Sequence, residues 1–256
     1  GKTDAVLGEF AIHASQYGVN AIGLMVRRNL TQLVETIERS RALYGPIGAK
    51  YNEQEKMWRF PNGARLRFAY LERDSDADGY QGHSYTRIYV EEITTFPDPK
   101  PIMKLMATLR SGAGVPCGFR ATGNPGGPGH HWVKARYIDA APGGWARRVE
   151  KYKNPWDGTT VERDRIFIPS RLSENKYLGA DYVANLQMAG SASLVRAWLA
   201  GDWSVIEGAF FDNWRPERHV VRPFRPPGDW IRFRAMDWGS AAPFAVLWCA
   251  VATDDY

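Results

Sequence analysis

Apolar and polar positions in the first part of the chain follow two alternating periods. Apolar residues within 6–17 recur at helical spacing, which predicts a helix that begins at Lys2. Ala21–Val26 is an apolar run of strand length, and Asn29 can cap a second helix whose apolar positions within 30–37 share one face. Helices alternating with a buried strand predict a parallel α/β sheet with helical crossovers. The helical apolar positions are Val6, Leu7, Phe10, Ala14 and Tyr17, followed by Leu30, Leu33, Val34 and Ile37.

A hairpin follows these elements. Met57–Phe60 and Arg65–Tyr70 flank Pro61-Asn62-Gly63, and Asn-Gly is a strong turn signal. On the second strand, Arg65 and Arg67 alternate with apolar residues, so one face is basic. These arginines have two interpretations, a contact with nucleic acid or a solvated strand face, and the second is favoured.

The next predicted strand, Arg87–Val90, ends on two adjacent acids, Glu91 and Glu92. A nucleotide-hydrolysing site needs one acid to hold Mg²⁺ and one to orient water. The chain also begins with Gly1-Lys2-Thr3, the last three residues of a phosphate-binding loop. Each motif is common by chance, but the two in this order predict an ATP-hydrolysing core.

A further strand, Cys117–Ala121, leads into a loop dense in glycine and proline, Thr122–Gly129. Such a loop places polar side chains and backbone N–H groups at the carboxyl edge of a sheet, where ligands bind in open α/β folds. His130 and His131 follow it. Adjacent histidines on a helix point in different directions, so we interpret them as a polar helix start rather than metal ligands.

Composition is consistent with a globular enzyme that meets a polyanion. The 256 residues are 44% hydrophobic, enough for one large domain or somewhat more. The net charge of +5 suits nucleic acid, although a mildly basic enzyme fits as well. The two cysteines, Cys117 and Cys249, lie far apart, which argues against a disulfide scaffold and fits a reducing compartment. No apolar run has the length of a membrane span, and the start does not resemble a signal peptide.

The last third of the chain divides by composition. Residues 169–203 are predicted to form a small helical subdomain, and 204–228 a linker rich in proline and arginine. Ile231–Met236 and Phe244–Val251 are predicted to pair as a hairpin whose first strand ends at Asp237.

Taken in their order along the chain, these motifs resemble the large terminase subunit of tailed bacteriophages. The resemblance runs from Gly1 to about Val251. The resemblance implies a P-loop NTPase core of the RecA-like type over 1–168, a helical lid over 169–203, a linker over 204–228 and the start of an RNase H-like nuclease domain over 229–256. The segments that carry it are Gly1-Lys2-Thr3, Tyr80-Gln81-Gly82-His83, Ile88-Tyr89-Val90-Glu91-Glu92, the stretches 121–130, 168–172 and 198–203, and Met236-Asp237-Trp238-Gly239.

The resemblance also implies roles for residues around ATP and Mg²⁺. Lys2 would neutralise the terminal phosphates, with backbone N–H groups from Gly1 onward as a cradle, and Thr3 would ligate Mg²⁺. Glu91 would take the metal-side position, and Glu92 would be the catalytic base.

Further roles concern coupling, charge stabilisation and cutting. Thr122 and Asn124 match the coupling motif of the family. Arg27 or Arg28 would stabilise charge in the transition state, or else carries an ordinary surface charge. Asp237 would be the first divalent-metal ligand of the nuclease, whose other acids would lie beyond Tyr256.

As a whole, the resemblance implies a motor that pumps double-stranded viral DNA into a procapsid and an endonuclease that cuts it. Expected partners are DNA, the portal protein, the small terminase subunit and further copies in a ring, in the host cytoplasm at the portal.

The chain departs from the pattern of the family in two ways. Glu91 stands where aspartate is more common, and the glycine-rich residues before Gly1 are missing, so we expect the chain by itself to be impaired. Two alternatives remain open: another DNA-dependent P-loop motor, such as a helicase or recombination ATPase, and a non-catalytic nucleic-acid-binding assembly fragment.

Overall fold

The computed structural model describes residues 1–175, 180–189, 192–204, 216–239 and 244–252. The chain divides into two compact units, residues 1–209 and 210–256.

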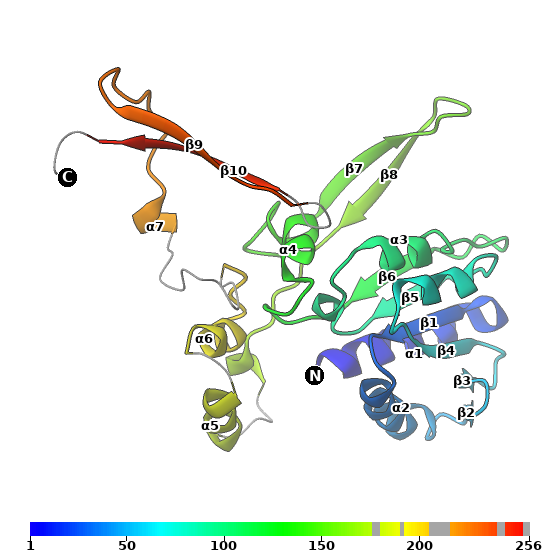
Figure 1. Cartoon of the computed structure of the whole chain (residues 1–256). Helices are drawn as coiled ribbons and strands as arrows, with labels where there is room; N and C mark the ends of the chain where they lie inside the picture. Colours follow the sequence, from blue (N-terminus) through cyan, green and yellow to red (C-terminus); the bar gives the residue numbers. More distant parts are fainter. Residues whose placement is uncertain (176–179, 190–191, 205–215, 240–243, 253–256) are drawn as a thin grey trace. The chain divides into compact units, whose positions relative to one another are not determined.

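A six-stranded sheet is the centre of the first unit, with the order β2-β3-β4-β1-β5-β6 (Figure 1). β1 lies parallel to both β4 and β5, and β5 lies parallel to β6, whereas β2 and β3 add an antiparallel edge. The predicted mostly parallel α/β sheet is therefore confirmed. The strands are β1 (Ile22–Arg27), β2 (Lys50–Asn52), β3 (Met57–Arg59), β4 (Arg65–Tyr70), β5 (Arg87–Val90) and β6 (Gly118–Ala121).

The central strands β1, β4 and β5 are mostly buried, because apolar residues of helices pack on both faces of the sheet. Consecutive strand residues point to opposite faces. Met25 and Tyr89 belong to a cluster with apolar residues of α1 (Lys2–Tyr17) and α2 (Leu30–Tyr44). Leu24 and Ile88 face the opposite cluster, which includes residues of α3 (Lys100–Met106) and α4 (His130–Val133). The core is thus a sheet between two helical layers.

Most predicted elements appear, with local differences. Leu33 and Ile37 are buried as expected, but Leu30 is 39% and Val34 is 49% exposed, so the apolar face of α2 is narrower than predicted. The polar stretch between β4 and β5 contains a 3₁₀ helix, η2 (Asp74–Tyr80). Short helical turns also occur as η1 (Gly18–Asn20), η3 (Ile93–Thr95), η5 (Leu172–Glu174) and the π-helical η4 (Lys134–Ile138).

A second hairpin in the first unit was not predicted. β7 (Arg148–Lys153) pairs in antiparallel register with β8 (Thr160–Arg165) and extends away from the six-stranded sheet (Figure 1). In the stretch predicted as a helical subdomain, the structure has α5 (Ala180–Ala189) and α6 (Ala192–Ala200). Trp198 of α6 donates its indole N–H to the carbonyl oxygen of Pro125 at 3.0 Å, which ties α6 to the loop after β6.

The second unit contains α7 (Pro216–His219), β9 (Ile231–Asp237) and β10 (Ala245–Val251). β9 and β10 form the predicted antiparallel hairpin, with Asp237 opposite Ala245. Within the described parts of the chain, no helix combines the length and apolar character needed to cross a membrane.

Candidate functional site

The predicted site residues of the first unit follow neighbouring parallel strands. The register pairs Val26 of β1 with Val90 of β5, and Val90 with Ala121 of β6. The segments after these residues leave the same edge of the sheet, as parallel strands require. This edge therefore gathers the arginines after Val26, the two glutamates after Val90 and the loop after Ala121.

Glu91 is a buried carboxylate, 1% exposed, with one oxygen held and one free. Its Oε2 accepts hydrogen bonds from Arg27 Nε at 3.1 Å and from Thr36 Oγ1 at 2.6 Å. Its Oε1 is buried and has no hydrogen-bond partner among the residues that the structure describes. Buried carboxylate oxygens are almost always paired, so this oxygen is suited to a group that protein atoms do not supply, such as a cation or its water.

Glu92 adopts a backbone conformation that non-glycine residues rarely have, with φ 50° and ψ 54°. Its N–H donates to Thr122 Oγ1 at 3.3 Å, and its Oε2 accepts from Asn124 Nδ2 at 3.3 Å. The backbone of Thr122 also continues the ladder, because its N–H donates to the carbonyl of Val90 at 2.9 Å. The strained turn at Glu92 is therefore fixed by the loop that follows β6.

Lys2 reaches the same loop from the first turn of α1. Its Nζ donates to the carbonyl oxygen of Gly123 at 2.9 Å and to Oδ1 of Asn124. Burial lowers the pKa of Lys2, while the negative charges of Glu92 and Glu91 act in the opposite direction. A chain of contacts thus runs from Lys2 through the amide of Asn124 to the carboxylate of Glu92.

The remaining predicted residues of this edge are less directly connected. Thr3 is half-buried in the first turn of α1, and the carbonyl oxygen of Gly1 accepts the N–H of Ala5 at 3.1 Å. Arg28 donates to Asp74 at 3.2 Å and lies over the ring of Phe96 at 5.4 Å.

Both candidate arginines therefore have partners in this structure, Arg27 at Glu91 and Arg28 at Asp74. A role for either one in stabilising the transition state stays a prediction. Thr36, which also holds Glu91, was missed by sequence reasoning. The signal for it was a polar residue on the buried side of α2, beside Leu33 and Ile37.

Asp237 lies in the second unit, exposed, as the last residue of β9. Among the described residues, no group of three histidine, cysteine or acidic side chains is placed to hold a metal ion. His130 is buried, accepts the N–H of Gly126 on Nδ1 at 2.9 Å and stacks on Trp203. Burial lowers the pKa of His130, which favours its neutral form in this packing position.

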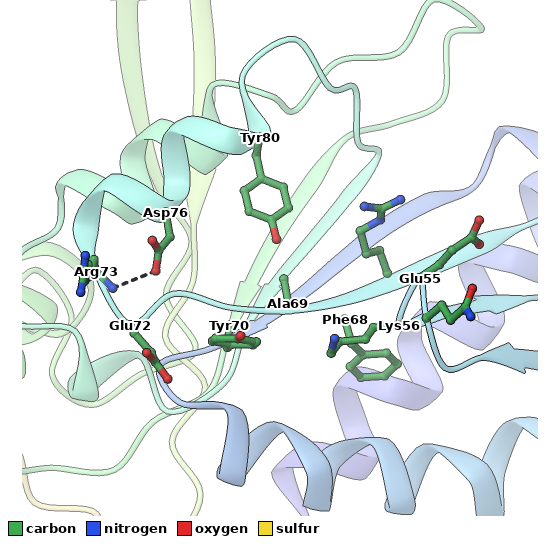
Figure 2. A pocket seen from close by; sticks show the side chains of 11 residues that line it. Glu55, Lys56, Phe68, Ala69, Tyr70, Glu72, Arg73, Asp76 and Tyr80 are labelled. Carbon is green, nitrogen blue, oxygen red and sulfur yellow. Dashed lines mark hydrogen bonds between the residues drawn. The ribbon is translucent and has the colours of Figure 1, made fainter.

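A cavity of about 490 Å³ lies beside β4 and η2 (Figure 2). Tyr70 and Tyr80 line it together with charged residues such as Lys56 and Asp76. None of its 11 lining residues belongs to the predicted nucleotide site, although Arg67, which the sequence offered as a possible nucleic-acid contact, is one of them. The chemistry at the strand edge therefore does not depend on this cavity.

Two solved structures share the fold. The structure of the large terminase from a thermophilic bacteriophage has a TM-score of 0.59 and 18% identity, and the match covers 99% of this chain and 58% of that one. A second structure of the same protein, in complex with ADP, has a TM-score of 0.58 and 18% identity, with 99% of this chain and 57% of that chain covered. This chain thus spans less than two thirds of the length of these relatives.

A search of curated proteins finds no match to this chain. The sequence matches the family described as "Terminase large subunit, T4likevirus-type, N-terminal" over residues 1–213. That match covers the whole six-stranded sheet, the loop after β6 and the two helices α5 and α6. The chain therefore belongs to the T4likevirus-type large terminase subunit family.

Proposed function

We propose that the strand edge binds and hydrolyses ATP, and that the full-length protein uses this reaction to drive double-stranded viral DNA into a procapsid. The observation that carries the proposal is the contact chain from Lys2 through Asn124 to Glu92, next to the buried Glu91. A cation, two acids and a relay amide at the carboxyl ends of parallel strands are the parts that ATP hydrolysis requires. Membership of the terminase family and the ADP complex of a relative with the same fold support it.

The residues at this edge fit a nucleotide with Mg²⁺. Lys2 would leave its contacts with the loop and neutralise phosphate charge, and the N-terminus of α1 would offer backbone N–H groups. Thr3 and the free Oε1 of Glu91 are the oxygens that would hold Mg²⁺, directly or through water. When bound, the cation would supply positive charge against the phosphate oxygens.

Glu92 is the proposed base, because its carboxylate is at the same edge and faces an amide rather than a cation. The amide of Asn124 contacts both Glu92 and Lys2, so movement of Lys2 toward a phosphate would change the hydrogen bonding of the base. We propose this as the route by which Thr122 and Asn124 sense the nucleotide. α6 contacts the same loop through Trp198, and it would carry the change onward as part of the lid.

Two other functions would use the same fold differently. A helicase or recombination ATPase would share the lysine and the acids, but the family match over 1–213 favours a terminase. A non-catalytic assembly fragment would keep the fold without turnover, so measurable ATP hydrolysis by the full-length protein would exclude it.

The proposal extends to DNA cutting in the second unit only through Asp237. A two-metal nuclease needs several converging carboxylates, and the described residues do not supply such a set around Asp237. Within the described residues, Asp237 by itself therefore does not make a two-metal cutting site. Portal protein, small terminase subunit and a ring of copies are proposed partners of the full-length protein, and the host cytoplasm at the portal is its proposed location.

The test uses the full-length protein and the Lys2→Ala variant. We expect Lys2→Ala to weaken Mg-ATP binding in calorimetry and to reduce steady-state hydrolysis by at least about a hundredfold, on the scale of losing a transition-state electrostatic contact. Lys50→Ala, at an exposed lysine of β2, is the matched control and should behave as wild type. Wild-type protein that binds no Mg-ATP, or a Lys2→Ala variant with full turnover, would contradict the proposal.

A further inference from the structure

The cavity beside β4 exists because β3 is shorter than β4. β3 begins at Met57, opposite Arg67, so it does not extend beside the last residues of β4. The N–H of Leu71 donates to Arg27 of β1 at 3.0 Å, and backbone groups alternate in direction along a strand. The N–H of Tyr70 therefore points away from β1, toward the side where β3 has ended. The cavity of about 490 Å³ occupies this side, and η2 forms another of its walls (Figure 2).

Two cations line the cavity at the end where β3 begins. The carbonyl oxygen of Lys56 accepts the N–H of Phe68 at 2.7 Å, and Met57 pairs with Arg67, so Lys56 and Arg67 belong to adjoining strands at the same level. Both residues are half-buried, and neither forms an ion pair with another residue that the structure describes. Placing charge in a partly buried position without a counter-charge is unfavourable. The pair is therefore suited to an anion.

The acidic residues of the wall have other partners or lie apart. Glu55 forms an ion pair with Arg59 at 2.7 Å. Asp76 accepts the backbone N–H of Arg73 at 2.9 Å. The positive charge of the two cations thus remains available to a ligand.

Tyr80 adds a neutral donor to the same cavity. Its phenol points from η2 toward β4 at Ala69 (Figure 2). Burial raises the pKa of Tyr80 while the positive charge of Arg67 acts in the opposite direction, so the phenol keeps its proton at neutral pH and lies within the field of the guanidinium. A guanidinium fork, an ammonium group and a phenol together offer donors to several oxygens of one anion.

The two ends of the cavity differ in charge. Lys56 lies at one end, whereas Glu72 and Asp76 lie at the other (Figure 2). A ligand with an anionic group at one end and hydroxyl or amino donors at the other matches this arrangement, and the volume exceeds the needs of a single small anion. We propose that the cavity binds a small phosphate ester of the nucleoside monophosphate class, at a site separate from the strand edge. The cations are half-buried, which suits a small ligand better than duplex DNA.

The backbone of Lys56 makes the proposal separable from folding. Its φ is 49°, in the left-handed region where glycine is the favoured residue. Lys56→Gly therefore removes the ammonium group and suits the local backbone at the same time. We expect this variant to keep or raise the free energy of unfolding and still to lose affinity for the ligand.

Calorimetry with AMP on the full-length protein tests the site. The Lys2→Ala background is used, because it impairs the proposed ATP site at the strand edge. We expect saturable AMP binding in this background, and adenosine should bind at least about tenfold more weakly because it brings no anion to the cations. Arg67→Met and Lys56→Gly should each weaken AMP by at least about tenfold, the scale of a charge-assisted hydrogen bond. Arg65→Met is the matched control, since Arg65 is a half-buried arginine of the same strand that does not line the cavity.

Four results would overturn the proposal. The first is the absence of saturable AMP binding, and the second is AMP binding by the wild type that Lys2→Ala abolishes, which would place AMP at the strand edge. The third is an equal loss of affinity in Arg65→Met and Arg67→Met, or wild-type affinity in Lys56→Gly. The fourth is displacement of AMP by a short DNA duplex, which would make the cavity a DNA contact.

Discussion

Arg27 and Glu91 form an ion pair across two neighbouring parallel strands, with Arg27 Nε 3.1 Å from Glu91 Oε2 and side chains only 12% and 1% exposed. Arg27 also donates from Nη1 to the carbonyl oxygen of Gln32 at 3.1 Å. The arginine therefore links the end of β1, the start of α2 and the carboxylate at the proposed nucleotide site. In this structure Arg27 holds the carboxylate of Glu91 in place.

Removing the charge of Arg27 should destabilise the fold. We expect Arg27→Met to lower the free energy of unfolding by about 3 kcal/mol, because Glu91 stays buried without its cation. The double variant Arg27→Met/Glu91→Gln should recover part of the loss. Arg28→Met is the control. It should lower the free energy of unfolding by less than about 1 kcal/mol, because the ion-pair partner of Arg28, Asp74, is 49% exposed. Urea unfolding of the four proteins measures this, and equal losses at Arg27 and Arg28 would contradict it.

Glu92→Gln should separate nucleotide binding from turnover. Glutamine keeps the shape of the side chain and its contact with Asn124 but cannot act as a base, so hydrolysis should fall by at least about a hundredfold while Mg-ATP binding survives. Glu35→Gln, at an exposed glutamate of α2, is the matched control. Near wild-type turnover in Glu92→Gln would transfer the role of base to Glu91.

The sequence predicted the strand edge well because its signals are local. An apolar run that ends in Glu91 and Glu92, and a loop of glycine and proline after β6, both mark strand ends without knowledge of the fold. The contact of Thr36 with Glu91 was not predictable in this way, because the two residues are 55 positions apart and meet only once α2 packs on the sheet.

The hairpin β7–β8 was not predicted from the sequence for a different reason. Its residues are almost all exposed, so it lacks the alternation of apolar and polar positions that identifies a half-buried strand. Cross-strand ion pairs such as Lys151 with Glu162 stabilise it instead, and charged residues at this spacing are also typical of loops.

Gly129 ends the loop after β6 at a point where no side chain fits. A Cβ at this position would lie 2.1 Å from the carbonyl oxygen of Phe96, and the N–H of Gly129 donates to the carbonyl of Thr94 at 2.7 Å. We expect Gly129→Ala to lower the free energy of unfolding by about 1–3 kcal/mol, since the backbone must shift. Gly79→Ala, where nothing lies within 4 Å, is the control for thermal unfolding, and similar melting of both variants would contradict the prediction.

His13 should make stability depend on pH below neutrality. Its side chain is buried and its Nε2 lies 2.9 Å from Thr86 Oγ1, and burial lowers its pKa from 6.5 to about 4. Above pH 6.5 histidine is neutral in both states. As the pH falls from 6.5 toward 4, the unfolded chain binds a proton that the folded chain does not, so the free energy of unfolding decreases.

The measurement compares denaturant unfolding at pH 7 and pH 5. Between pH 7 and pH 5, the free energy of unfolding of wild type should fall by about 2 kcal/mol more than that of His13→Gln. This follows from a linkage of about 1.4 kcal/mol per pH unit. His83→Gln, at an exposed histidine, controls for the substitution itself. An identical pH dependence in wild type and His13→Gln would mean that the ring binds its proton equally well in the folded and unfolded chains, and would contradict the prediction.

The proposed packaging function requires the full-length protein to move along any genome, so we expect its DNA binding to be electrostatic and nearly blind to sequence. The exposed cations that suit phosphate contacts include Arg222 and Arg225, and neither has an ion-pair partner among the described residues. Arg65 and Arg67 of β4 are half-buried, which makes them weaker candidates for a DNA contact than the sequence suggested.

The salt dependence of affinity tests this assignment. The double variant Arg222→Gln/Arg225→Gln should reduce the slope of log K against log[salt] by about 1.8, since each phosphate contact on duplex DNA contributes about 0.9. Arg41→Gln/Arg59→Gln removes the same charge from arginines already paired with Glu53 and Glu55, so it should change the slope little. Phosphate contacts position the protein without specifying sequence, so unrelated duplexes should compete equally. A slope that does not change in the first variant, or strong preference for one duplex, would place DNA recognition on other residues.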